Sequence, residues 1–211
     1  MRSYYLVWSF TSINAWIWSS VFHTRGEFNL PATEKLDYFS AALAILYALY
    51  YTVIRLFHLY PRQSRLTLTG ASRPTSLASK SWPLLCIIAY VTHVSYLSLL
   101  PRFDYTYNMA FNLAIGLTHN FLWLLYSLPT TAIRRFPSKP KSYRPGYVGK
   151  AAIFVAFTTA ATALELLDFP PWGGIIDAHA LWHLSTAPIA LFWYDFLVDD
   201  ALDGSWREQR V

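Results

Sequence analysis

The sequence is poor in cysteine and in charge. Its single cysteine, Cys86, excludes an intramolecular disulfide framework and any zinc site built from several cysteines. Charged residues make up only 14% of the chain, whereas an ordinary soluble domain has about 25%. Glycine-rich phosphate loops, internal repeats and low-complexity tracts are absent as well, so the sequence indicates neither a phosphate-binding loop nor a repeat architecture.

Apolar residues dominate instead. They account for 55% of the 211 residues, and a soluble fold of this size would leave large apolar patches exposed. The same composition excludes intrinsic disorder. Aromatic residues make up 18% of the chain, and abundant Trp and Tyr are typical of the two interfaces of a bilayer. The composition therefore predicts an integral membrane protein.

Six segments approach the roughly 20 apolar residues that a membrane-spanning helix needs. We expect an all-α, polytopic helical bundle in which residues 1–211 form a single transmembrane domain. The first apolar run lacks a clear cleavage site and is interpreted as a span. Prolines such as Pro31 and Pro83 mark predicted ends, whereas Pro188 lies inside the last segment, where we expect a kink. The predicted helices cover about residues 5–22, 37–60, 82–100, 105–128, 148–167 and 175–198.

Basic residues sort the connecting loops into two sets. Four Lys and Arg residues follow the second predicted helix and five follow the fourth, with no acidic residue in either loop. The positive-inside rule places these two loops and both termini in the cytosol, and the other three loops in the lumen. Attraction to anionic lipid explains the basic loops better than nucleic-acid binding does, so no nucleic-acid partner is expected.

Five polar side chains are predicted to lie in one leaflet, where polar groups are expensive and usually functional. Ser19 and His23 are four residues apart near the luminal end of the first predicted helix, and Asp37 opens the second. His179 and His183 are also four residues apart, near the luminal start of the sixth, so each pair shares one helix face. Three helices thus bring these groups to a similar depth.

These residue types suit a metal-dependent hydrolase. Three neutral imidazoles can hold one zinc ion and leave a position for water, whose pKa the ion lowers to about 7. Asp37 is the candidate general base, and Ser19 could donate a hydrogen bond to an oxyanion. The segment from His179 to His183 lacks the Glu of the HExxH motif, which weakens a peptidase interpretation. A structural alternative has the two histidines hydrogen-bonding across helices.

His93 and His119 lie near the middles of the third and fourth predicted helices. A haem site with two axial histidines is one interpretation of this pair. A structural role in the helix interior is favoured, because no second histidine pair is matched to them at another depth.

Several stretches of the chain resemble the Per-one-like family, and they occur in order along nearly its whole length. The stretches are NAWIWSSVFHTR (14–25), TEKLDYFS (33–40), HVSYLS (93–98), FDYTYN (103–108), LELLDFPP (164–171) and DAHALWH (177–183).

The resemblance implies a fold and an activity. The family belongs to a superfamily of membrane hydrolases with alkaline ceramidases and adiponectin-type receptors, which share a seven-helix bundle. It implies a Zn²⁺ cofactor bound by His23, His179 and His183, with Ser19 and Asp37 as the catalytic pair of a transmembrane hydrolase domain. The implied reaction hydrolyses the sn-2 acyl ester of GPI-anchored proteins, giving lyso-GPI, in the endoplasmic reticulum membrane or, alternatively, the Golgi membrane.

The chain also departs from the family pattern. Six helices are predicted where seven are expected, and the family's cysteine-rich luminal segment is not found ahead of them. We expect that the chain lacks the first helix of the family, either as a fragment or as a shortened paralogue. Two other functions stay open: a ceramide amidohydrolase, and a non-enzymatic receptor-like or metal-handling membrane protein. The oligomeric state is left undetermined.

Overall fold

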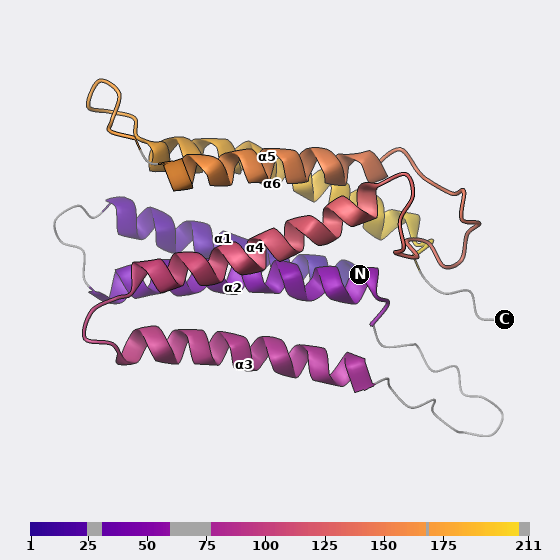
Figure 1. Ribbon diagram of the computed structural model, residues 1–211, viewed down its shortest axis with the longest axis horizontal. Helices are drawn as coiled ribbons and strands as arrows, with labels where there is room; N and C mark the ends of the chain where they lie inside the picture. Colours follow the sequence, from indigo (N-terminus) through magenta and orange to yellow (C-terminus); the bar gives the residue numbers. More distant parts are fainter. Residues whose placement is uncertain (25–30, 60–76, 168, 207–211) are drawn as a thin grey trace. The chain divides into compact units, whose positions relative to one another are not determined.

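The computed structural model describes residues 1–24, 31–59, 77–167 and 169–206. Within these ranges the protein is all-helical, with six helices and no β-strand, which confirms the predicted fold class at the level of secondary structure. The helices are α1 (Arg2–Thr24), α2 (Pro31–Leu56), α3 (Leu77–Leu99), α4 (Tyr105–Ser127), α5 (Val148–Leu167) and α6 (Ala178–Asp203) (Figure 1).

Several predicted helix ends were wrong, and proline explains two of the errors. Pro31 is the first residue of α2 rather than a breaker before it, because the N–H group that proline lacks has no partner at that position anyway. Asp37 therefore lies in the second turn of α2 and does not open the helix. Pro83 lies inside α3, which begins at Leu77, so the predicted start at residue 82 is also wrong.

The ends of α6 are set by two residues that lie outside the helix. The Asp177 side chain accepts a hydrogen bond of 2.7 Å from the backbone N–H of Ala180 and so caps the N-terminus. Gly204 has the left-handed backbone conformation (φ 66°) that often ends a helix. The helix thus runs from Ala178 to Asp203 and not over 175–198. Pro188 lies inside α6 as expected, and the kink there stays a prediction.

Two helices have the length and hydropathy of a membrane span. These are α2 and α3, with mean hydropathies of 1.6 and 1.5 over their most apolar stretches. The other described helices do not reach the same measure, so six membrane crossings are not established by composition alone. Polar side chains are one reason, because α1 and α4 each carry Ser, Thr and Asn residues along their length.

The chain divides into two compact units, Met1–Gly116 and Leu117–Val211, and the boundary falls within α4. In the first unit α1 lies antiparallel to α2 (Figure 1). The Tyr5 and Tyr51 rings meet at one end of the pair with centroids 5.3 Å apart, and Phe22 lies 6.3 Å from Tyr38 at the other. These contacts bring the end of α1 to the beginning of α2.

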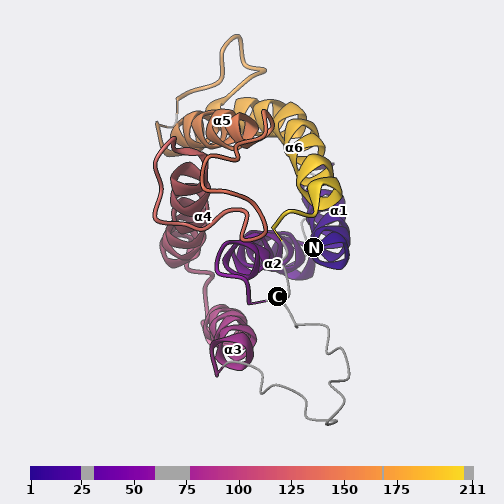
Figure 2. The same cartoon turned by 90° about the vertical axis from the view of Figure 1, so that its right-hand side faces the viewer.

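The second unit is built on α5 and α6, which lie side by side (Figures 1 and 2). Its core is aromatic. The fully buried Trp193 ring stacks on Phe154 and Phe196 with centroid distances of 3.9 and 4.5 Å, and Trp123 meets it edge-on at 5.0 Å. Offset stacks and edge-on contacts are the favoured geometries of such rings, so this core fixes how α5 and α6 pack.

Arginines of the basic loop cap the end of α4. Arg135 Nη1 donates to the carbonyl oxygens of Tyr126 and Leu128 at 3.0 and 2.9 Å, and Arg144 Nη2 donates to Ser127 O at 2.7 Å. The last carbonyl groups of a helix have no partner within it, so these bonds satisfy groups that would otherwise be left over. Burial, and then the neighbouring Arg144 charge, lower the pKa of Arg135 from its ordinary value.

Candidate metal centre

Two of the predicted metal ligands lie together on the first turns of α6. His179 and His183 are both half-buried, and their Nε2 atoms are 3.1 Å apart. The rings meet edge-on, with centroids 4.6 Å apart. Trp182 lies beside both rings, with centroids 5.6 and 4.7 Å away, and forms an apolar wall next to them. Their positions follow directly from the helix, because residues four apart share one face.

The separation of the two nitrogens fits a metal ion. Zinc holds imidazole nitrogens at about 2.0–2.1 Å, so two ligands of a tetrahedral site lie about 3.3 Å apart. The observed 3.1 Å between the Nε2 atoms of His179 and His183 is close to that value. A small rotation of either side chain closes the difference. The two nitrogens are therefore close enough to share one metal ion, and in the structure they lie at hydrogen-bonding distance from each other.

The other three predicted site residues belong to the first unit. His23 is exposed in the last turn of α1, Ser19 is half-buried one turn earlier, and Asp37 is buried in the second turn of α2. Phe22 is next to His23 in the sequence, and Tyr38 is next to Asp37. The contact between the Phe22 and Tyr38 rings therefore brings the end of α1 and the second turn of α2 together. These three residues therefore lie at the same end of the α1–α2 pair.

The structure distinguishes the two adjacent serines at the end of α1. Ser20 is exposed, and its hydroxyl donates to the Trp16 carbonyl oxygen at 2.8 Å. The Ser20 hydroxyl proton is therefore donated to the helix backbone, a common arrangement for serine within a helix. Ser19 lies on a different face of α1 and is half-buried.

His119 is a structural residue of the aromatic core. It is buried, its Nε2 accepts a hydrogen bond of 3.2 Å from the Trp123 indole, and its Nδ1 lies 3.3 Å from Asn120 Oδ1. Both ring nitrogens are thus engaged by protein groups, which favours the structural interpretation over an axial haem ligand. His93 is fully buried in the first unit, where its ring stacks on Phe111 at 3.9 Å.

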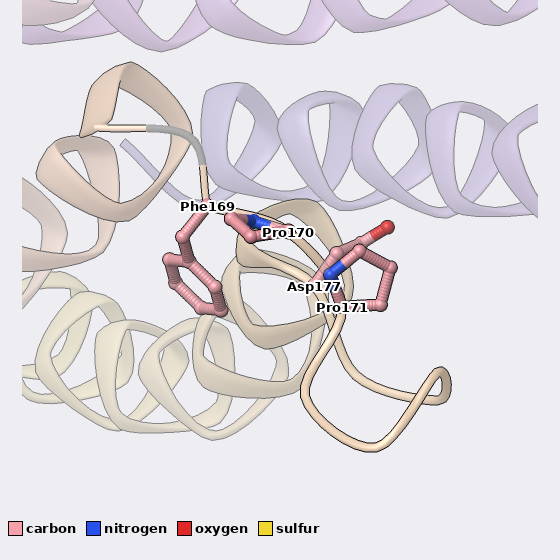
Figure 3. Close-up of a pocket in the computed structure, with 4 residues that line it drawn as sticks. All are labelled: Phe169, Pro170, Pro171 and Asp177. Carbon is pink, nitrogen blue, oxygen red and sulfur yellow. The ribbon is translucent and has the colours of Figure 1, made fainter.

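One surface that was not predicted from the sequence lies just before the histidine pair along the chain. The segment between α5 and α6 forms an open pocket of about 390 Å³ lined by Phe169, Pro170, Pro171 and Asp177 (Figure 3). Asp177 is also the N-cap of α6, two residues before His179. A run of eight uncharged residues, 169–176, between two aspartates was the available signal.

Comparison with known proteins decides the family. The sequence model of the Per1-like family matches residues 1–201, nearly the whole chain. The chain belongs to the Per1-like family. All five predicted site residues lie within the matched range, and so does the apolar segment before α6. No solved structure matches the chain significantly.

Sequence similarity to curated proteins agrees with this family assignment. The chain is 40% identical over 198 residues to a Xenopus laevis protein named GPI-specific phospholipase A2-like PGAP3, covering 93% of this chain and 53% of that protein. The human protein of the same name is 38% identical over 197 residues, covering 93% and 52%. A Schizosaccharomyces pombe protein named PER1 homolog is 41% identical over 193 residues, covering 92% and 51%. The chain thus spans about half the length of these relatives.

Proposed function

We propose that this chain carries the catalytic helices of a zinc-dependent membrane hydrolase that removes the sn-2 acyl chain of GPI anchors. The main support is the pair of Nε2 atoms 3.1 Å apart on α6, found in a member of the Per1-like family. The names of the vertebrate relatives describe a GPI-specific phospholipase A2-like protein. A phospholipase A2 cleaves an ester at the sn-2 position, so those names support the proposed reaction, and the nitrogen pair supports a bound metal.

All six helices are proposed to cross the membrane. Large apolar side chains are exposed in both units, among them Phe10 (72% exposed), Ile87 (60%) and Leu191 (73%). Apolar surface of this extent is unfavourable in water and is expected on helices that face lipid. The positive-inside rule then places the basic loops in the cytosol and the proposed site toward the lumen of the endoplasmic reticulum or Golgi.

The proposed third metal ligand is His23 of α1, as the resemblance to the Per1-like family implies. His23, His179 and His183 together offer three imidazole donors, the ligand set of a catalytic zinc site that keeps one position open. When bound there, zinc lowers the pKa of water so that hydroxide is available at neutral pH. The all-nitrogen ligand set also suits other transition metals, and zinc is chosen because the site is proposed for hydrolysis without a redox step.

Asp37 and Ser19 are proposed to act on the substrate side of the reaction. The buried Asp37 carboxylate would take a proton from the attacking water and pass it to the departing sn-2 oxygen. The Ser19 hydroxyl would donate a hydrogen bond to the carbonyl oxygen as negative charge develops on it. The acyl carbon–oxygen bond breaks, the water oxygen joins the acyl carbon, and the products are a free fatty acid and lyso-GPI.

The test is a deacylation assay with the detergent-purified chain. A GPI lipid with a labelled sn-2 chain, a diacyl phosphatidylinositol and a ceramide serve as substrates, and the products are identified by mass spectrometry. We expect fatty acid and lyso-GPI from the first substrate, with a chelator stopping the reaction and added zinc restoring it. Release of sphingosine from ceramide instead would contradict the proposed substrate.

A variant of a histidine outside the proposed site controls for the loss of an imidazole ring as such. His58 lies beyond the end of α2, on the opposite end from Asp37, and has a positive φ of 56°. Asparagine tolerates that backbone conformation, so His58→Asn removes one imidazole without adding strain. His183→Ala should abolish deacylation whereas His58→Asn should retain it. Equal activity in the two variants would show that the histidine pair is not needed.

A further inference from the structure

The segment between α5 and α6 exposes an apolar tip. Residues 169–176 read FPPWGGII and contain no charged or hydrogen-bonding side chain except the indole. Trp172 is 66% exposed, Ile175 82% and Ile176 40%. Large apolar side chains rarely cluster so openly on a surface that faces water, and a cluster of this kind usually marks an interaction surface.

The tip has a defined conformation. The Trp172 N–H donates to the Ile176 carbonyl oxygen at 2.8 Å and closes the turn. Gly173 and Gly174 take φ values of 61° and 72° within it, a region that glycine adopts without strain. The Phe169 ring stacks on the Trp172 indole with centroids 4.8 Å apart. These contacts hold the apolar side chains in place before any partner arrives.

Exposed apolar side chains also lie on the two helices that flank this tip. Leu166 and Leu167 at the end of α5 are 50% and 76% exposed, and Leu184 near the start of α6 is 68% exposed. A tryptophan at the end of a lipid-facing helix is typical of the level of the lipid headgroups. Exposed apolar side chains at the tip and on both flanking helices therefore favour lipid, and not a separate protein partner, as what covers the tip.

The tip is directly connected to the histidine pair. Asp177 ends the segment, caps α6 through Ala180 N–H and lines the pocket with Phe169 (Figure 3). His179 follows two residues later and His183 one turn beyond. The depth of the tip in a bilayer therefore fixes the depth of both imidazoles, because a capped helix end transmits position rigidly over so short a distance.

We propose that the segment 169–176 is a membrane anchor that inserts among lipid acyl chains at the bilayer interface and holds His179 and His183 at the level of the lipid ester bonds. The partner is a lipid bilayer surface, and the pocket beside Phe169 would receive the first part of an acyl chain. Its volume of about 390 Å³ lies within the usual range of small-ligand sites. The link to ester bonds rests on the proposed function, whereas the insertion of the tip does not.

Insertion can be measured without enzymatic activity. In the full chain with Cys86→Ser, a spin label is attached at Ile175→Cys or, as the comparison, at Ser142→Cys in the exposed basic loop. The protein is placed in phospholipid nanodiscs, and collision rates with oxygen and with a water-soluble nickel complex are recorded. We expect a label at 175 to meet oxygen and to be protected from nickel, and one at 142 to show the reverse. Equal nickel accessibility at both positions would overturn the proposal.

A second measurement tests the consequence for lipid substrates. Ile175→Ser removes an apolar side chain from the tip, and Leu202→Ser removes a comparably exposed one (79%) from the far end of α6. Ile175→Ser should raise the apparent KM for a bilayer-presented ester about tenfold, the order expected when an isoleucine no longer leaves water. The kcat for a short-chain soluble ester and the zinc content should not change, and Leu202→Ser should change none of these.

The outcomes separate the two proposals. A protected label at 175 in a protein that hydrolyses no ester would refute the proposed function and support the anchor. An active protein with a nickel-accessible label at 175, or one in which Ile175→Ser and Leu202→Ser have the same effect on KM, would refute the anchor and leave the hydrolase intact.

Discussion

Replacing His183 by alanine should weaken zinc binding by more than 100-fold. Loss of a group that only orients a metal ligand already costs about 10–100-fold in affinity, and His183 is proposed to bind the ion itself. Its Nε2 atom lies 3.1 Å from that of His179, so the wild-type helix presents both nitrogens with little rearrangement. A 100-fold loss corresponds to about 2.7 kcal/mol.

Neighbouring hydroxyl groups on α6 are not placed to replace the lost ring. Ser185 Oγ donates to the Trp182 carbonyl oxygen at 2.9 Å, and Thr186 Oγ1 donates to the His183 carbonyl oxygen at 3.1 Å. Both hydroxyls are bound to the helix backbone. The full loss of one donor should therefore be visible in the measured affinity.

The assay is a competition titration of detergent-purified protein against a chromophoric zinc chelator, with metal content measured by elemental mass spectrometry. Wild type and His58→Asn should hold about one zinc per chain, and His183→Ala much less. In the double variant with His179→Ala the further loss should be smaller than the first, because groups that act as one unit are not additive. Wild-type affinity in His183→Ala, or an equal loss in His58→Asn, would refute the reasoning.

Three further predictions concern single side chains. Ser19→Ala should lower kcat about 10²–10³-fold, as loss of one oxyanion donor does. Ser20→Ala should have little effect, because that hydroxyl is bound to the helix backbone. Steady-state kinetics on a GPI lipid measure kcat for both variants. Asp37→Asn should lower kcat about 10²–10⁴-fold while zinc content stays the same, and loss of zinc as well would instead assign it to the metal site. Arg135→Gln should reduce the free energy of unfolding by about 1.5–3 kcal/mol, because the buried guanidinium donates to two carbonyl groups at the end of α4. Arg134→Gln, at an exposed position, should change the free energy of unfolding by less than about 0.5 kcal/mol. Equal thermal midpoints of the two variants would contradict this prediction.

Local sequence patterns predicted the helices well where the pattern itself forms the element. The range 148–167 coincides with α5, and the prediction for α4 differs by one residue at its end. Predictions failed where one residue permits two outcomes. Pro83 was interpreted as an end, yet it lies in the second turn of α3, where its missing N–H removes one helical hydrogen bond without ending the helix. Pro31 does begin α2, because a first helical residue needs no N–H donor, but the start predicted at residue 37 lies six residues too late.

The sequence by itself determined the pairing of His179 with His183, because a spacing of four residues on any α-helix brings two side chains to one face. It also determined the family, because extended similarity needs no coordinates. Only the tertiary structure decided that the end of α1 meets the second turn of α2, through Phe22 and Tyr38, because packing of distant segments depends on all side chains at the contact. The conformation of the turn at 172–176 was decided in the same way, by a hydrogen bond and two backbone angles that composition does not encode.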